Sequence, residues 1–297
     1  MNPREEGFLL LTSSLGDPNR HPLTVAQFRT LAERVRTAVR APEDRSLETR
    51  DLMGMGYGRE MAERILSLLN DSVLLKHYLR RGERSECQPL SRISETYPIT
   101  VHNRLGTDAP GCLWAKGDLS LLDKPAVALV GSRDIGTENL AFAQEVGRQA
   151  AYQGFVLVSG NARGADRAAQ ESCLAAGGEV ICVVADELER HTHRTNMLYL
   201  SEDGYDLPFS AQRALSRNRV IHCMGLRTFV AQVGYRHGGT WDGAVKNLRS
   251  GWSPLYCYDD GSAAVKLLQE MGAEGIRLAD LHDISALPVR YFGLFDQ

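Results

Sequence analysis

The chain has 297 residues, of which 43% are hydrophobic and 24% are charged, and its formal net charge is −3. This length and composition predict a globular protein of one or two domains with an ample apolar core. The slightly negative charge excludes a protein that coats nucleic acid through bulk positive charge. Any contact with nucleic acid must therefore be local.

Cysteine usage and hydropathy indicate the compartment. The six cysteines lie far apart without a CxxC pair, which is typical of a reducing environment. The N-terminal apolar run is short and follows acidic residues, unlike a signal peptide. No stretch approaches the ~20 apolar residues that span a membrane. We expect a cytoplasmic protein that does not contact membranes.

Residues 1–88 predict a small, all-helical domain. Helical periodicity covers 26–39 and 59–69, on either side of the glycine-rich segment MGMGYG at 53–58. That segment is similar to the glycine hairpin of helix-hairpin-helix modules, which hold DNA phosphates on backbone amides. A plain turn in a SAM-like helical bundle fits better, because no basic residues accompany the glycines. Residues 89–123 contain three prolines and no clear period, so we expect an extended connector packed on the core.

From residue 124 the pattern alternates between short valine-rich strands and helices. The expected strands are 126–130, 155–158, 180–185, 228–233 and 254–258. The expected helices are 137–152, 164–176, about 209–224, 240–249 and 262–271. Gly154, Gly177 with Gly178, and Gly251 are placed to end three of these helices. Residues 124–285 therefore predict an α/β fold, a Rossmann-like, doubly wound, mostly parallel sheet, with a C-terminal tail at 286–297.

Three of these strands run into glycine turns that precede helices. In a parallel sheet such turns share one edge, and glycine lets the backbone approach a ligand closely at a positively polarised helix start. Two of the turns also carry an arginine, which binds phosphate bidentately. The sequence therefore predicts a phosphate-binding crevice, with these residues as its candidates: Gly131, Ser132, Arg133, Ser159, Gly160, Arg163, Gly164, Gly238, Gly239 and Thr240.

The first turn also excludes common nucleotide cofactors. Gly131 and Gly136 do not have the spacing of the GxGxxG fingerprint, and Arg133 occupies a glycine position of that motif. No Walker lysine follows the turn either. We expect neither NAD nor ATP, and no other cofactor.

Asp166 and the tripeptide Arg217-Asn218-Arg219 are further candidates. A carboxylate at Asp166 favours the helix dipole and can hold Arg163 or Ser159 in place. Plain helix capping explains Asp166 equally well, and a catalytic role would need a second acid or a histidine beside it. Arginines two apart on a helix diverge by roughly 200°. Both can reach one groove only if the tripeptide lies at the end of an element.

Basic residues gather between Phe209 and Arg249, facing Asp242 as the single acid. Taken alone, such a cluster fits a solvated charged face better than a binding surface. The histidines at 191, 193 and 222 have no acid or cysteine at a fixed ligand spacing. We therefore expect no metal site.

In this order the motifs resemble those of the DprA/Smf family, the DNA-processing proteins of natural transformation. VGSR at 130–133 is followed by SGNARGAD at 159–166, SE at 201–202, RNRVI at 217–221 and a glycine turn at 238–239. Upstream, YP at 97–98 and LWAKG at 113–117 are similar to the family's lead-in. The resemblance covers about 95–275.

The resemblance implies a dimeric Rossmann-like core that binds single-stranded DNA without sequence preference and passes it to a RecA-type recombinase. Carried over by position, Arg133, Arg163, Arg217 and Arg219 would pair with DNA phosphates, while Ser159, Gly160 and Gly164 would donate hydrogen bonds. Single-strand binders usually add stacking aromatics, for which Tyr235 and Trp241 are candidates, with core packing as the alternative. We expect no catalytic residue.

The chain also departs from the family pattern. It has RGAD where members tend to have RGID, Leu215-Ser216 before the RNR tripeptide, and Gln232 where an acid is common. We also expect no C-terminal winged helix, which some members have. Its GGTWDGA turn is similar to that of Rossmann-like nucleotide sensors and nucleoside-monophosphate N-glycosidases. The alternative is therefore a nucleotide sensor, or a hydrolase in which Asp166 or Asp242 activates water. A third hypothesis is an adaptor whose helical region binds another protein.

Overall fold

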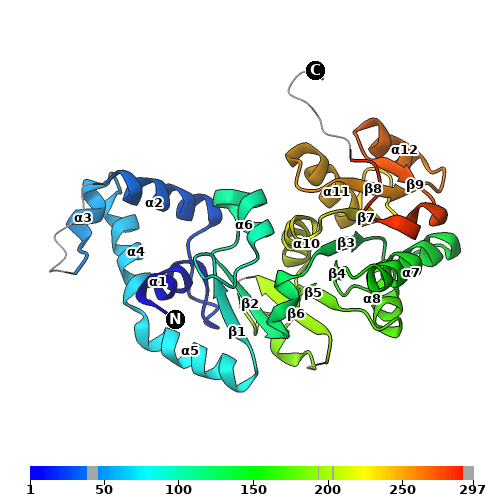
Figure 1. Ribbon diagram of the computed structural model, residues 1–297. Helices are drawn as coiled ribbons and strands as arrows, with labels where there is room; N and C mark the ends of the chain where they lie inside the picture. The colour runs from blue at the N-terminus through cyan, green and yellow to red at the C-terminus, as the bar shows by residue number, and fades with distance from the viewer. Residues whose placement is uncertain (39–45, 193, 203, 290–297) are drawn as a thin grey trace.

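The computed structural model describes residues 1–297 except 39–45, 193, 203 and 290–297, so most of the expected tail lies outside the described residues. A group of helices leads into one large sheet that has helices packed on it (Figure 1). Across the described ranges, no helix is both long enough and apolar enough to cross a membrane.

The N-terminal helical region is confirmed. It contains α1 (Pro3–Thr12), α2 (Val25–Thr37), α3 (Thr49–Gly54), α4 (Arg59–Asn70) and α5 (Ser72–Arg84). Asn2 and Thr24 accept hydrogen bonds from first-turn amides, which fixes where α1 and α2 begin. An apolar cluster holds α1 to α4 together: Leu11, Leu23, Phe28, Leu31, Leu52, Ala62, Ile65 and Leu68. The glycine-rich segment forms the turn between α3 and α4, where Gly56 has a φ of +87°.

The α/β prediction is also confirmed. One sheet has the order β1-β2-β6-β5-β4-β3-β7-β8-β9, and pairing from β6 to β9 is parallel, while β1 and β2 are antiparallel additions. The strands are β1 (Gln88–Ser91), β2 (Cys112–Gly117), β3 (Ala126–Val130), β4 (Val156–Ser159), β5 (Val180–Val184), β6 (Met197–Glu202), β7 (Thr228–Val230), β8 (Leu255–Tyr258) and β9 (Glu274–Ile276).

The sequence predicts an extended connector at 89–123, but much of this segment belongs to the sheet. It supplies most of β1, all of β2, and the short helices α6 (Ile99–Leu105), η1 (Gly106–Asp108) and η2 (Leu119–Asp123). Pro89 is compatible with β1 because an edge strand leaves some amide positions unpaired. Lys116 obscures the apolar pattern of β2, and its amine donates a hydrogen bond to the Glu189 carbonyl at 3.1 Å. Strands β6 and β9 were not expected either.

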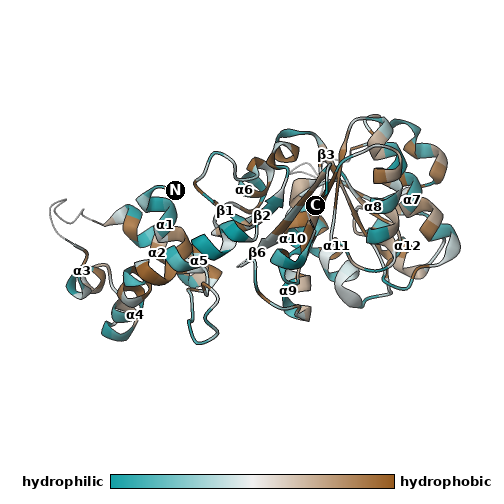
Figure 2. Cartoon of the chain, turned by 90° about the horizontal axis from the view of Figure 1, so that it is seen from below, coloured by the Kyte–Doolittle hydropathy of each residue, from teal (hydrophilic) through white to brown (hydrophobic). Residues whose placement is uncertain are grey.

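Helices cover both faces of the sheet, as a doubly wound fold requires. Val127 and Leu129 of β3 pack toward α7 (Thr137–Tyr152), α8 (Ala165–Ala175) and η4 (Leu278–Asp283). Ala128 and Val130 pack toward α10 (Asn218–Met224), α11 (Gly238–Ser250) and α12 (Ala263–Glu270). The hydrophobic colouring of the central strands in Figure 2 follows from this burial on both faces.

The glycines that were expected to end three helices do so, but one expected helix is divided in two. Gly154, Gly177 and Gly251 all have positive φ values after α7, α8 and α11. The region 209–224 is split into α9 (Ala211–Ser216) and α10, with Arg217 between them. A further short helix, η3 (Leu188–Arg190), follows β5.

Candidate nucleic-acid interface

A crevice opens at the carboxyl edge of the parallel strands. The chain leaves β3 toward β4, β5 and β6 on one side and returns to β7 on the other side of β3. The loops after β3 and β7 therefore diverge, which is where doubly wound folds bind ligands. The crevice has a volume of about 530 Å³, and residues from all three glycine turns and from α9 and α10 line it, among them Gly131, Ser132, Arg133, Ala162, Asp166, Phe209, Leu215, Arg217, Asn218, His237, Gly238, Gly239, Thr240 and Asp242.

The turn after β3 is held against the start of α8. A Cβ on Gly131 would lie 2.4 Å from the Cβ of Ala165, so only glycine allows this approach. Gln232 fixes the loop from β7, because its side-chain oxygen accepts from the Gly136 amide at 2.7 Å and its carbonyl accepts from the Ser132 amide at 3.0 Å. The turn is thus positioned before any ligand binds.

The turn after β4 is organised around Asp166. This buried carboxylate accepts hydrogen bonds from the amides of Gly160 at 3.1 Å and Ala162 at 3.3 Å. Gly164 has a φ of +85°, and a Cβ there would lie 2.5 Å from the carbonyl oxygens of Ser132 and Arg133. Asp166 is therefore a positioning residue for the loop, a role that goes beyond helix capping.

Two expectations for this turn are wrong. The Gly160 amide does not face a ligand, because it donates to Asp166. Ser159 is fully buried, and its hydroxyl accepts a short hydrogen bond from the Gln170 side chain. Neither group is placed to bind a phosphate.

Arg217 is the central cation of the crevice. Its side chain lies directly over Gly160, where an added Cβ would be 1.3 Å from Nη1. The residue is only 7% exposed, and its Nε and Nη1 atoms have no hydrogen-bond partner among the described residues. A buried guanidinium with unmatched donors is costly, so this site favours an anion that supplies acceptors.

Arg217 and Asp166 influence each other's ionisation. Burial lowers the pKa of Arg217, and the Asp166 carboxylate opposes that change. Burial likewise raises the pKa of Asp166, and the Arg217 charge and the two loop amides oppose the rise. The Arg133 guanidinium adds a second positive charge near Arg217. Asp166 is thus the main opposing charge for Arg217, with a smaller effect from Asp186, and Arg133 brings a second guanidinium to the same place.

The third turn supplies the start of α11. Gly238 has a φ of +88°, and the side-chain amide of Asn218 donates to the Gly239 carbonyl at 3.1 Å. His237 precedes the helix but gives its first-turn amides no side-chain cap. An uncapped helix start beside Arg217 is favourable to anions. Thr240 also lines the crevice.

Two predicted phosphate ligands lie away from the crevice. Arg163 does not line it; this exposed side chain forms an ion pair with Asp134 at 2.6 Å. Arg219 pairs with the buried Glu202 at 3.0 Å and donates to the Asp108 carbonyl at 2.5 Å. The RNR tripeptide does lie at an element end as expected, but its two arginines still point to different places.

Part of the basic cluster at 209–249 serves the fold. Arg213 donates to the carbonyls of Ala185 and Leu207, and Arg227 donates to the Ser285 carbonyl. By contrast, Arg236 and Lys246 are exposed. The cluster is therefore neither wholly a solvated face nor wholly a binding surface.

Phe209 is a crevice residue that sequence reasoning missed. Its side chain is 54% exposed, and the Arg133 guanidinium lies 5.7 Å from its ring centre. The only available signal was an aromatic residue between a strand and the N-cap of a helix, which is a weak pattern. Of the expected aromatics, Tyr235 is 53% exposed, while Trp241 is partly buried against the core.

The structure gives little support for metal or hydrolytic chemistry. The described ranges hold no group of three His, Cys, Asp or Glu residues that could bind a metal ion. His191 hydrogen-bonds Asp186 at 2.9 Å, which holds the pKa of that carboxyl down, and His193 lies outside the described residues. Asp166 is committed to the loop amides, so Asp242 is the remaining acid of the crevice lining.

Comparisons with known proteins agree with this arrangement. The model of the family described as DNA recombination-mediator protein A matches residues 88–274. DNA processing protein DprA of Streptococcus pneumoniae is 33% identical over 141 residues, which cover 44% of this chain and 50% of that protein. Protein Smf of Escherichia coli is 30% identical over 156 residues, covering 49% of this chain and 41% of that protein. The matches thus span half or less of the length of these two relatives.

Two solved structures extend the comparison. The X-ray structure of DprA from Streptococcus pneumoniae has a TM-score of 0.71 and 23% identity, and it covers 95% of this chain and 97% of its own. A structure of DNA processing protein A from Helicobacter pylori, which concerns its single-stranded DNA binding mode, has a TM-score of 0.55 and 25% identity. It covers 66% of this chain and 94% of its own. The first likeness extends over the N-terminal helices as well as the sheet.

Proposed function

The chain belongs to the DNA recombination-mediator protein A family, and on that premise we propose that its crevice binds single-stranded DNA without sequence preference. The observation that carries the proposal is Arg217, a buried guanidinium in a crevice where three glycine turns meet. Its Nε and Nη1 atoms have no hydrogen-bond partner among the described residues. Phosphate oxygens supply the missing acceptors, and phosphates are common to every sequence.

The remaining crevice residues suit a strand better than a mononucleotide. Arg133 and the uncapped start of α11 can each take a further phosphate. Phe209 offers an exposed ring on which a base can stack whatever its identity. The crevice is also open to solvent along its rim, where Arg133, Phe209 and His237 are exposed.

The recombination part of the proposal rests on the family to which the chain belongs. The described function of the family is to mediate recombination, and the Helicobacter pylori relative binds single-stranded DNA. We therefore extend the proposal to a homodimer that passes its bound strand to a RecA-type recombinase. Loading of such a recombinase onto strand pre-bound by this protein, measured by strand exchange, tests that extension.

The hydrolase alternative has less support. Cleavage of the bond between base and ribose needs a carboxylate free to activate water, and Asp166 is held by two amides and faced by Arg217. Asp242 is exposed at the crevice, and Asp166 is the other acid of the lining. If hydrolysis occurs, Asp242→Ala should abolish base release and leave DNA affinity nearly unchanged.

Fluorescence anisotropy of a labelled oligonucleotide across a salt series tests the main proposal. We expect tight binding that weakens steeply with salt, because each phosphate contact releases counterions. Oligonucleotides of different sequence should bind alike, and mononucleotides should not displace them. Weak binding of the strand, with displacement by one particular mononucleotide, would contradict the proposal and favour a nucleotide sensor.

A further inference from the structure

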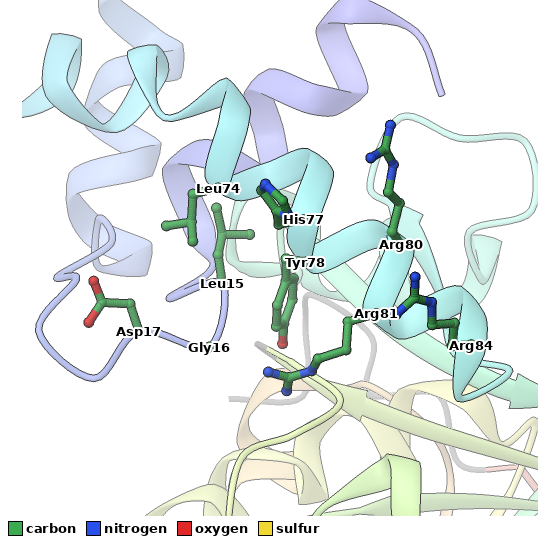
Figure 3. Close-up of a pocket in the computed structure, with 9 residues that line it drawn as sticks. All are labelled: Leu15, Gly16, Asp17, Leu74, His77, Tyr78, Arg80, Arg81 and Arg84. Atoms are coloured by element: carbon green, nitrogen blue, oxygen red, sulfur yellow. The ribbon is translucent and has the colours of Figure 1, made fainter.

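A second positively charged hollow lies on α5, outside the crevice. Its volume is about 500 Å³, and it is lined by α5 and by Leu15, Gly16 and Asp17 of the loop after α1 (Figure 3). On α5 the basic lining residues are His77, Arg80, Arg81 and Arg84. We call these four residues the basic stripe.

The basic stripe follows one face of the helix. Its members have the spacing i, i+3, i+4 and i+7, which places them side by side, while Leu75, Tyr78 and Gly82 of α5 are buried. Like charges at these spacings repel each other and destabilise a helix. The negative end of the helix dipole favours Arg81 and Arg84 in the last turn, but it does not account for Arg80 further back.

Among the described residues, Arg81 is the member of the basic stripe that forms an ion pair. Arg81 forms an ion pair with Asp206, and the Tyr78 hydroxyl donates to the same carboxylate at 2.6 Å. Figure 3 shows Arg81 reaching from α5 toward the core. No ion pair joins Arg80 or Arg84 to any carboxylate of the described residues, and Asp17 is the single acid in the lining. The two free guanidinium groups therefore leave the hollow positively charged.

The hollow lies at the same edge of the sheet as the crevice. β6 is parallel to β5 and ends at Glu202, so the segment after it emerges where the glycine turns emerge. Asp206 in this segment is held by Arg81, and Phe209, three residues later, lines the crevice. Three residues span at most about 11 Å between Cα atoms. Asp206 therefore lies within about 11 Å of Phe209 along the chain, and α5 lies one ion pair beyond it, through Arg81.

We propose that the basic stripe of α5 continues the DNA path, so that a strand leaving the crevice past Phe209 places its next phosphates on Arg80 and Arg84. This inference rests on the proposed function and assigns the N-terminal helices a share of the DNA contact. Guanidinium groups bind phosphates without reading bases. These added contacts should therefore make the affinity depend on the length of the oligonucleotide and not on its sequence. An acidic peptide is the competing occupant of the same charges.

The test compares two oligothymidines, of about 6 and about 25 nucleotides, on the wild-type chain and on Arg80→Ala/Arg84→Ala. These side chains are exposed and alanine favours helix, so α5 should stay folded. We expect the double variant to bind the long oligonucleotide about tenfold more weakly, with its salt slope reduced by about 1.4 for two lost phosphates. Affinity for the short oligonucleotide should not change.

Arg36→Ala/Arg59→Ala, which removes two exposed arginines from α2 and α4, is the matched control and should bind both oligonucleotides as the wild type does. Arg80→Gln/Arg84→Gln repeats the test with polar side chains. If the double variants keep the full salt slope on the long oligonucleotide while Arg217→Gln loses binding, the inference is overturned and the proposed function stands. If the wild type binds neither oligonucleotide, the inference and the proposed function are both overturned. Binding of a polyglutamate peptide that the variants lose, with DNA binding intact, would also overturn the inference.

Discussion

Arg217 and Arg219 are two residues apart, yet they serve different regions of the molecule. Arg217 faces the crevice over Gly160, with Nε and Nη1 unpartnered among the described residues. Arg219 faces the groove between the core and α6, where Glu202 and the Asp108 carbonyl accept its hydrogen bonds. The fold supplies acceptors to both terminal nitrogens of Arg219, whereas Nη1 of Arg217 has none among the described residues.

This contrast separates a binding arginine from a structural one. Both side chains are mostly buried, and both belong to the same three-residue motif. Burial and motif membership therefore do not distinguish their roles, whereas the supply of acceptors does. A cation whose donors are matched inside the fold should affect stability when removed, and a cation with unmatched donors should affect binding.

The largest expected effect is on stability, and it concerns Arg219, the structural arginine of the two. Arg219→Gln leaves the buried Glu202 without its cation, which should lower the free energy of unfolding by about 3 kcal/mol. Urea unfolding measures this change. DNA affinity of the folded variant should match the wild type, and a large loss of affinity without a loss of stability would place Arg219 in the binding site.

His222 on α10 gives a stability effect that depends on pH. Burial lowers its pKa to about 3, against about 6.5 in an unfolded chain. Between these values the unfolded state takes up a proton that the native state does not, so stability is complete above pH 6.5 and falls as the pH drops toward 3. At pH 5 the cost is about 2 kcal/mol.

Urea unfolding at pH 7 and pH 5 checks the His222 prediction. His222→Leu removes the titrating ring, so this variant should lose less stability than the wild type between the two pH values. Equal losses in both proteins would show that His222 does not carry the effect. DNA binding measured above pH 6.5 is free of this contribution, which keeps the crevice and fold effects apart.

Gly160 allows the crevice to be disturbed without removing a charge. A Cβ at this position would collide with the Arg217 guanidinium, so Gly160→Ala should displace it and weaken DNA binding about tenfold. Gly136→Ala is the control from the same sheet edge, because its Cβ would meet only contacts of 3.5 Å or more. Anisotropy titrations of the two variants should differ; equal affinities would mean that the position of Arg217 is unimportant.

Ser159 has the smallest expected effect. Its buried hydroxyl accepts from Gln170, so Ser159→Ala should cost about 1 kcal/mol of stability and leave DNA affinity unchanged. Thermal unfolding and anisotropy on the same preparation measure both quantities. A weaker affinity with unchanged stability would restore the role that the sequence suggested for this hydroxyl.

Sequence patterns predicted the parallel core and the meeting of the glycine turns, because both depend on local signals. Valine-rich runs marked β3, β4 and β5, and glycines marked the turns and helix ends. The same patterns missed β2, because the buried Lys116 interrupts its apolar run and donates to the Glu189 carbonyl, which is distant in sequence.

The partners of polar side chains within the site could not be predicted in the same way. Nothing near Ser159 shows that Gln170 reaches its hydroxyl, and nothing near Arg219 shows that Glu202 takes its charge. Asp166 could be placed in the first turn of its helix, but its bonds to two loop amides depend on the folded loop. These roles are set by tertiary contacts.

The most direct measurement is the salt dependence of DNA affinity for Arg217→Gln beside Arg219→Gln. We predict that Arg217→Gln binds oligothymidine about 10- to 100-fold more weakly, with a salt slope smaller by about 0.7, and that Arg217→Lys recovers part of the loss. Arg219→Gln should keep the wild-type slope. If Arg217→Gln keeps both affinity and slope, the crevice is not the DNA site.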